Sequence, residues 1–200
     1  MNKRGLLIVV SGPSGAGKGT LCRAYVKKHP DTFLSVSATT RQPREGETDG
    51  KDYYFLSVED FKSRLDNDGF FEYAVFCDNY YGTPKEYVLK KLEEGTDVIL
   101  EIEVQGAMSV RAHYPEGVFV FTVPPSMDVL RERLINRRTE TEDVIDKRLE
   151  RAKSEIMMAA KYNYILINDM IDSTVEELEA IIVAEKLRAA RNMDALEKMK

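Results

Sequence analysis

The chain is poor in cysteine, and its two cysteines, Cys22 and Cys77, lie far apart in the sequence. Two isolated thiols without the close spacing of metal ligands exclude a disulfide framework and a cysteine-based metal site, and they favour a reduced cytosolic compartment. Long apolar runs are also missing. The first run, Leu6–Val10, has only five residues and leads into a glycine-rich segment, so neither a signal peptide nor a membrane span is predicted. We therefore expect a cytoplasmic protein with no membrane partner.

An excess of positive charge is absent as well. The 200 residues include 29 lysines and arginines against 34 aspartates and glutamates, which gives a net charge of −5. Binding to a nucleic-acid backbone depends on a surplus of basic residues, so no nucleic acid is predicted as a partner. The basic residues cluster locally instead, which suits a small phosphorylated ligand. An apolar content of 43% at this length is enough for one domain with a sizeable core.

Short apolar runs alternate with helical patterns along most of the chain. Buried strands are predicted at 6–10, 98–102, 118–123 and 164–167, and helices at 21–28, 106–113, 127–137 and 175–193. Strands that alternate with helices form crossover units, so the fold class is α/β, with a parallel sheet covered by helices. Ser126 and the spacing Ser173-x-x-Glu176 are expected to mark the starts of two helices.

Two segments interrupt this alternation. Residues 37–94 are rich in turns and aromatics and predict a small inserted α+β lobe, with short antiparallel strands around a helix at 58–68 and a helix capped by Thr83. Residues 137–148 are highly charged and favour a solvated, mobile flap. The expected organisation is a single domain over 1–200. Its core comprises 1–36, 95–136 and 163–200, the lobe 37–94, and a helical lid about 137–162.

The glycine-rich segment after the first predicted strand is the most specific motif. Gly12-Pro13-Ser14-Gly15-Ala16-Gly17-Lys18-Gly19-Thr20 has the position and composition of a phosphate-binding P-loop between a strand and a helix. Glycines let successive backbone N–H groups turn toward an anion, the helix start adds partial positive charge, and Lys18 supplies a cation for the β- and γ-phosphates. Gly19 stands where such loops usually have serine or threonine. Whether Thr20, one residue later, can replace that hydroxyl near magnesium stays open.

A pair of arginines points to a second anion. Arg41 and Arg44 are three residues apart around Pro43, so a bend at the proline would let both guanidinium groups reach one phosphate, which they match in geometry. Because a P-loop binds one nucleotide, this pair predicts a second phosphorylated substrate. The alternative is a solvated loop with two unrelated charges.

Several ordered motifs resemble those of the guanylate kinase family. They are Ser37-Ala-Thr-Thr-Arg41-x-Pro-Arg44-x-Gly46-Glu47, Gly50-x-Asp52-Tyr53, Glu72, Asn79-Tyr-Tyr-Gly-Thr83, Glu101-Ile-Glu103-Val-Gln-Gly106, and Arg137-x-Thr139-Glu140-Thr141 with Arg148. The resemblance extends from the P-loop to Asn168, nearly the whole chain. It implies a P-loop sheet core with an inserted nucleotide lobe and a lid. It also implies ATP-dependent phosphorylation of GMP to GDP, with ATP and GMP as substrates and Mg²⁺ arriving with ATP.

The resemblance also implies roles for individual residues. The GMP phosphate would be held by Arg41, Arg44, Tyr53 and Tyr81, and the guanine would be surrounded by Ser37, Glu72, Thr83 and Glu103. ATP would be held by Gly12, Pro13, Ser14, Gly15, Ala16, Gly17, Lys18, Gly19 and Thr20, with Asn168 near the adenine. Catalysis would depend on Lys18, Arg41, Arg137 and Arg148, with Arg133 nearby.

Elementary chemistry supports guanine without the resemblance. Guanine presents N–H donors at N1 and N2, and ionised carboxylates such as Glu72 and Glu103 can only accept hydrogen bonds. Adenine has a lone pair at N1, so a carboxylate pocket would leave acceptors facing each other, a mismatch that can reach about 10⁴-fold in selectivity. Aspartate is commoner in the family where Glu103 stands, so its reach differs by one methylene.

Magnesium is expected through ATP phosphates and water rather than through a direct protein ligand. Thr20 and Glu101 are the residues that could orient such water, because Glu101 ends an apolar strand where a carboxylate can do so. No general base is needed, because the acceptor is already a phosphate oxygen.

Each single assignment has a simpler alternative. Tyr53 and Tyr81 could be core residues, Glu72 could face solvent, Thr83 could serve only as a helix cap, Asn168 could end a strand, and Arg133 could serve solubility. Two other functions compete with the main one. They are a kinase for another small phosphate acceptor and a catalytically inactive module that binds phosphorylated peptides. The intact P-loop disfavours the second, and the carboxylates disfavour the first. The oligomeric state is not predicted.

Overall fold

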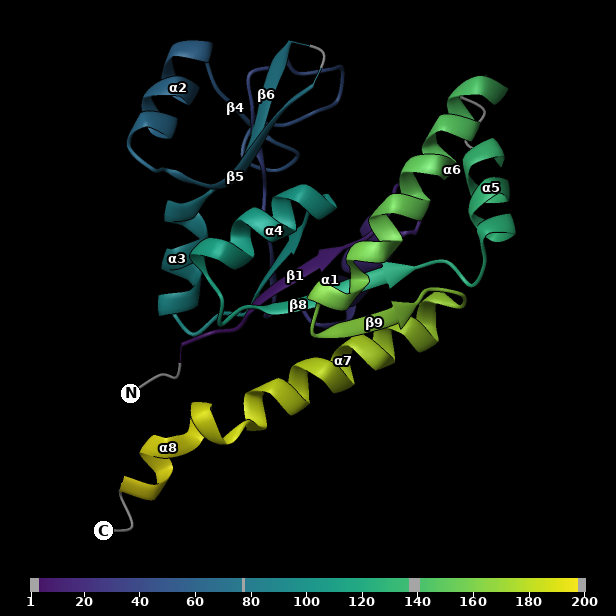
Figure 1. Cartoon of the computed structure of the whole chain (residues 1–200). Coiled ribbons are helices and arrows are strands. Elements are labelled where there is room, and N and C mark those ends of the chain that lie inside the picture. Colours follow the sequence, from purple (N-terminus) through teal and green to yellow (C-terminus); the bar gives the residue numbers. More distant parts are fainter. Residues whose placement is uncertain (1–3, 77, 137–140, 198–200) are drawn as a thin grey trace. The chain divides into compact units, whose positions relative to one another are not determined.

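The computed structural model describes residues 4–76, 78–136 and 141–197. They divide into two compact units: Met1–Ser11 with Pro30–Phe119, and Gly12–His29 with Val120–Lys200. The elements in chain order (Figure 1) are β1 (Leu7–Ser11), α1 (Lys18–Lys28), β2 (Phe33–Leu34), β3 (Ala38–Thr39), β4 (Tyr54–Phe55), α2 (Val58–Asp66), β5 (Phe70–Phe76), β6 (Asn79–Pro84), α3 (Lys85–Glu93), β7 (Val98–Glu101), α4 (Val104–His113), β8 (Val118–Val123), α5 (Met127–Asn136), α6 (Glu142–Ile156), the 3₁₀ turn η1 (Met157–Lys161), β9 (Tyr164–Ile167), α7 (Ile171–Leu187) and α8 (Ala189–Glu197).

Parallel strands form the base of the first unit, in the order β2-β7-β1. Leu7 of β1 and Phe33 of β2 both lie opposite Val98 of β7. All five residues of β1 are buried, which is expected of an apolar run with both faces covered. The buried Asp97 accepts a hydrogen bond from the backbone N–H of Leu6 at 2.9 Å and so ties the start of β7 to the start of β1.

A second sheet of the first unit has the order β4-β3-β6-β5. β6 is antiparallel to β3 and to β5, whereas β3 and β4 are parallel, so the sheet is mixed rather than purely antiparallel as predicted. The long segment 40–53 between β3 and β4 is the physical reason, because a parallel return needs a connection of about a dozen residues or more. Phe61 of α2 stacks on Phe70 at 4.3 Å between ring centroids and forms a core with Ala38.

Strand β5 contains a bulge. Phe70 pairs with Pro84, but the next paired residue, Tyr73, lies opposite Gly82, so Phe71 and Glu72 together face Thr83. Bulges of this kind bend a strand and redirect side chains. Phe71 is buried, with its ring edge-on to Tyr114 at 6.1 Å, at the contact between β5 and α4.

In the second unit β8 and β9 are parallel, with Val120 opposite Tyr164. α7 packs along β9 (Figure 1) and contacts α1. The Tyr164 hydroxyl donates to the buried Glu185 carboxylate at 2.7 Å. The single helix predicted at 175–193 is wrong. The backbone becomes extended at Arg188, which donates to Glu185 at 3.2 Å, and α8 begins one residue later.

The predicted flap is also wrong for the part that the structure describes. Residues 142–148 belong to helix α6, which packs on α5 (Figure 1). Buried Ile145 and Ala152 of α6 contact Leu130 and Leu134 of α5. The dense charges around this apolar stripe hid its helical spacing. Residues 137–140 lie outside the described residues.

Two of the three predicted helix caps are wrong. The Ser126 hydroxyl accepts from the N–H of Val129 at 3.2 Å and does cap α5. α7 begins at Ile171 after Met170, so Ser173 and Glu176 lie inside the helix. Thr83 does not cap α3, since Pro84 precedes its first residue.

Among the described residues, no helix combines the length and the apolar character that a membrane crossing requires.

Candidate functional site

The glycine-rich loop between β1 and α1 belongs to the second unit and has a backbone that only glycine adopts easily. Gly12 has φ +145°, and a Cβ there would lie 2.1 Å from the carbonyl oxygen of Thr122. Gly17, the residue before α1, has φ +89°, and its Cβ would lie 2.3 Å from Nδ2 of Asn168. Two of the loop's glycines are therefore fixed by both backbone conformation and space.

Lys18 is the first residue of α1, three residues before the predicted helix start. Its side chain is only 8% exposed, and its ammonium group donates to the carbonyl oxygens of Gly12 at 2.7 Å and Pro13 at 3.2 Å. The cation therefore lies within the loop that precedes it. The N–H groups of the first helical turn have no partner inside the helix and carry the positive end of its dipole. The loop thus has the charge of an anion-binding site.

Asn168 holds the far side of this loop. The residue follows β9 and is 5% exposed, and its side-chain amide donates to the carbonyl oxygen of Ala16 at 2.8 Å. Arg133 of α5 donates to the carbonyl oxygen of Asn168 at 2.8 Å and lies 3.5 Å from that of Ala16. Two residues far from the loop in sequence therefore share one loop carbonyl, and Arg133 is engaged rather than simply solvated.

Of the other predicted cationic residues of the second unit, Arg148 reaches the loop. It lies within α6, not at its start, and its guanidinium is 3.3 Å from the Ser14 hydroxyl. Arg137 lies outside the described residues. Lys18 and Arg148 therefore converge on the glycine-rich loop, together with Arg133 and Asn168.

Two residues are predicted near magnesium. Thr20 and Glu101 are both exposed, and Glu101 stands at the carboxyl end of β7. Within residues 4–76, 78–136 and 141–197, no group of three or more His, Cys, Asp or Glu side chains could hold a metal ion.

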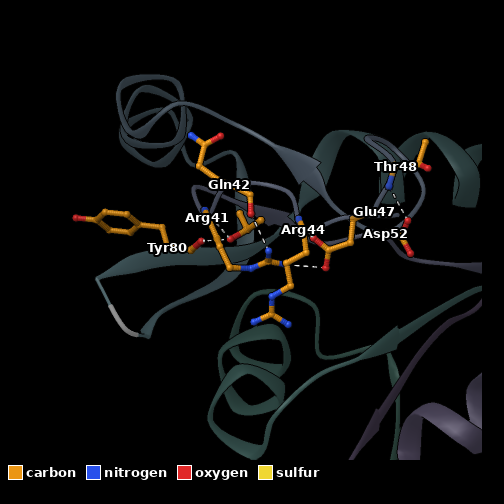
Figure 2. A network of polar contacts seen from close by, with 8 residues as sticks. Arg41, Gln42, Arg44, Glu47, Thr48, Asp52 and Tyr80 are labelled. Carbon is orange, nitrogen blue, oxygen red and sulfur yellow. Dashed lines mark hydrogen bonds and ion pairs between the residues drawn. The ribbon is translucent and has the colours of Figure 1, made fainter.

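In the first unit, the loop after β3 is organised by Glu47 (Figure 2). One carboxylate oxygen accepts from the Arg41 guanidinium at 2.8 Å, and the other accepts from the backbone N–H of Arg44 at 2.7 Å. Arg41 also donates to the carbonyl oxygen of Gln42 at 2.7 Å. The hydrogen bond to Glu47 raises the pKa of Arg41, and the same bond lowers the pKa of Glu47. Glu47 had been part of a sequence motif but had no predicted role.

Aromatic rings line the same loop. The Arg41 guanidinium lies 5.5 Å from the ring centroid of Tyr53 and 6.0 Å from that of Phe55, within the range of cation–π attraction. Tyr53 meets Tyr81 edge-on at 6.1 Å, and burial raises the pKa of Tyr53. Both tyrosines are half-buried, so they are not simply core residues. The structure therefore brings the side chains of Arg41, Tyr53 and Tyr81 together.

Glu72 is a half-buried carboxylate on β5 with one well-defined partner. The Thr83 hydroxyl of β6 donates to its Oε1 at 2.7 Å. Burial raises the pKa of the Glu72 carboxyl, and hydrogen bonds from the Thr83 hydroxyl and backbone partly offset the rise. A plain solvent-facing position is therefore excluded for Glu72, and the hydroxyl of Thr83 serves this carboxylate rather than a helix.

Ser37 and Glu103 are the other two residues that were predicted to contact guanine. Ser37 is half-buried, and its carbonyl oxygen accepts from the N–H of Tyr54 at 2.9 Å. Glu103 is exposed and precedes α4 as its N-cap, without a side-chain cap hydrogen bond. Sequence reasoning missed the structural roles of Glu47 and of Gly106, which lies against Glu72. Neither role had a local sequence signal.

The chain is similar to known proteins of one family. The family described as guanylate kinase matches residues 4–185. A guanylate kinase of Caldanaerobacter subterraneus subsp. tengcongensis is 57% identical over 194 residues, which cover 97% of this chain and 94% of that protein. A guanylate kinase of Clostridium acetobutylicum is 55% identical over 194 residues, which cover 97% of this chain and 92% of that protein.

A solved structure gives the same result. The crystal structure of guanylate kinase from Anaplasma phagocytophilum is 31% identical, covers 94% of this chain and 90% of its own, and superposes with a TM-score of 0.74. The predicted α/β fold class is confirmed by this likeness and by the parallel strands and flanking helices of each unit. The chain belongs to the guanylate kinase family.

Proposed function

We propose that the protein transfers the γ-phosphoryl group of ATP to GMP and releases ADP and GDP. The observation that carries the choice of GMP is the half-buried Glu72 carboxylate, held by the Thr83 hydroxyl at 2.7 Å, in a chain whose relatives are named guanylate kinase. An ionised carboxylate accepts hydrogen bonds and cannot donate them, so it complements the N1–H and N2–H₂ donors of guanine.

On the donor side, we assign ATP to the loop of residues 12–20. Its backbone N–H groups and the start of α1 favour binding of the phosphates. The Lys18 ammonium donates to two loop carbonyls, and we propose that it donates to phosphate oxygens instead when ATP is bound. Asn168 uses its amide to hold Ala16, so its proposed part in ATP binding is to fix the loop next to the adenine position.

On the acceptor side, we assign the GMP phosphate to Arg41, Arg44, Tyr53 and Tyr81. A guanidinium has five N–H donors in a planar fork, so Arg41 can keep Glu47 and still offer further N–H groups to a phosphate. We assign the guanine to Glu72, Thr83, Ser37 and Glu103. Thr83 supports this role because its hydroxyl already orients the Glu72 carboxylate.

For the transfer itself, the protein needs positioned cations more than covalent chemistry. We propose that Lys18, Arg41, Arg137 and Arg148 neutralise the charge that develops on the transferring group. The contact of Arg148 with Ser14 supports its share. The proposed organisation keeps a GMP lobe over 37–94 and a lid over about 137–162, which excludes water when both substrates are bound.

Mg²⁺ arriving with ATP would neutralise part of the negative charge of the phosphates. Thr20 and Glu101 are the residues that we assign to its water shell, since both residues are exposed and carry side-chain oxygens. We also propose that the reaction takes place in the cytoplasm, which the low cysteine content and the wide sequence separation of Cys22 and Cys77 support.

The proposed function is tested by ADP release with ATP and each of GMP, AMP, UMP, CMP and dTMP. We expect GMP to be used with the highest kcat/KM by a wide margin; another acceptor in first place would overturn the proposal. Lys18→Ala should abolish turnover and leave GMP binding intact. Lys27→Ala is the matched control, because Lys27 is an exposed lysine of the same helix and its removal should change neither quantity.

A further inference from the structure

Gly106 lies in the first turn of α4, directly against the carboxylate of Glu72. A Cβ built on Gly106 would lie 2.9 Å from Oε2 of Glu72 and 3.2 Å from both its Cδ and its Cγ. These are the three nearest atoms, and all of them belong to Glu72. The space that Gly106 leaves open is therefore occupied by one side chain.

The backbone does not explain a glycine at this position. Gly106 is the third residue of a helix and is not among the residues with positive φ, so alanine would fit the backbone. A glycine inside a helix is less favourable than alanine by about 1 kcal/mol. The close approach of Glu72 does require glycine, because the methyl group of an alanine would lie too near its carboxylate.

Glu72 is confined from its other side as well. The Thr83 hydroxyl donates to Oε1 at 2.7 Å, and the bulge in β5 sets Phe71 and Glu72 together opposite Thr83. The carboxylate thus lies between the hydroxyl of β6 and the first turn of α4. An extra carbon on α4 would push it by about half an ångström to reach ordinary contact at 3.4 Å.

We propose that Gly106 is a positioning residue for guanine recognition, because its missing side chain lets the Glu72 carboxylate stand between Thr83 and α4 with its acceptor oxygens aimed at the base. This rests on the proposed GMP kinase function. Gly106 itself does not touch the substrate in this account and acts through Glu72.

The test is Gly106→Ala in steady-state kinetics, with thermal unfolding measured in parallel. We expect KM for GMP to rise roughly tenfold or more, the range for losing a hydrogen bond to a charged group. KM for ATP should stay within about twofold, and the unfolding midpoint should stay or rise because alanine favours the helix. Ser109→Ala, one turn further along α4, raises helix propensity in the same way and should leave both KM values unchanged.

A double-mutant cycle separates positioning from a general effect on structure. Glu72→Asp raises KM for GMP by itself, but its shorter side chain withdraws from the added methyl group. Gly106→Ala should therefore raise KM for GMP about tenfold in the Glu72 background and less than twofold in the Asp background. If Gly106→Ala raised KM for GMP by the same factor in the wild-type protein and in the Glu72→Asp variant, the inference would be overturned.

The outcomes remain distinguishable. A wild-type protein without GMP-dependent ADP release would refute the proposed function. An active wild type with unchanged GMP kinetics in Gly106→Ala would refute the inference alone. If Gly106→Ala is too unstable to assay, the double variant Glu72→Asp/Gly106→Ala should regain the wild-type unfolding midpoint, and a double variant as unstable as the single one counts against the inference.

Discussion

Asn168→Ala removes the side-chain amide that donates a hydrogen bond to the carbonyl oxygen of Ala16 at 2.8 Å. The bond lies in the interior, since Asn168 is 5% exposed. The next donor is the Arg133 guanidinium at 3.5 Å, which already donates to the Asn168 backbone at 2.8 Å. The substitution therefore leaves a buried loop carbonyl poorly satisfied.

The magnitude follows from that carbonyl. An unsatisfied buried acceptor costs about 1–3 kcal/mol, and partial replacement by Arg133 favours the lower part of that range. We expect the free energy of unfolding to fall by about 1–2 kcal/mol. Because the amide holds the loop rather than facing a ligand, kcat/KM should fall by a similar factor with ATP and with GTP as phosphoryl donor.

The measurement combines urea unfolding with coupled ADP or GDP release. Asn168→Asp is the matched control of equal size. Its oxygen would face the Ala16 carbonyl in place of the amide, so it should be less stable than Asn168→Ala at neutral pH. Unchanged unfolding, with an activity loss confined to ATP, would refute this reasoning and indicate that Asn168 reads the adenine directly.

Three further predictions use the same logic. Glu72→Gln should raise KM for GMP about tenfold or more. In the wild type, KM for GMP should rise as the pH falls through the pKa of the Glu72 carboxyl, which lies above its ordinary 4.5. A Glu72→Gln variant with the same pH dependence of KM would show that another group causes it. Glu47→Gln has one acceptor for the two donors held now, so KM for GMP should rise severalfold and kcat should fall with it, because Glu47 holds the proposed catalytic residue Arg41; a lower KM would mean that Glu47 competes with the phosphate. Gly12→Ala should cost about 2–4 kcal/mol in unfolding by denaturant, because its Cβ meets a backbone carbonyl at 2.1 Å; Gly46→Ala, with positive φ but open space, should cost only about 1–2 kcal/mol, and equal losses would contradict the steric argument.

The buried strands could be predicted because their sequence pattern is local. β1, β7, β8 and β9 lie within one residue of the predicted ranges at each end, since continuous apolar runs suit strands covered on both faces. The bend that ends α7 could not be predicted in this way. The backbone leaves the helical conformation at Arg188, a change that the pattern of apolar residues does not encode.

The candidate site shows the same limit. The glycine-rich loop could be identified because its residues are adjacent in sequence and Gly12, Gly15 and Gly17 have the positive φ that its backbone requires. The support of the loop by Asn168 and Arg133 links residues more than a hundred positions apart. The role of Gly106 depends on a bulge in another element. Such contacts follow from tertiary packing, so only the coordinates reveal them.

The bulge in β5 restricts how this chain can change length. Phe70 packs on Phe61 in the core of the second sheet, Phe71 meets Tyr114 of α4, and the next residue is the carboxylate that Thr83 holds. Three consecutive residues thus serve three different neighbourhoods. An insertion or deletion at this point would shift all three side chains away from their present contacts, whatever residue is gained or lost. We therefore expect β5 to tolerate substitutions, above all at its exposed positions, but not insertions or deletions.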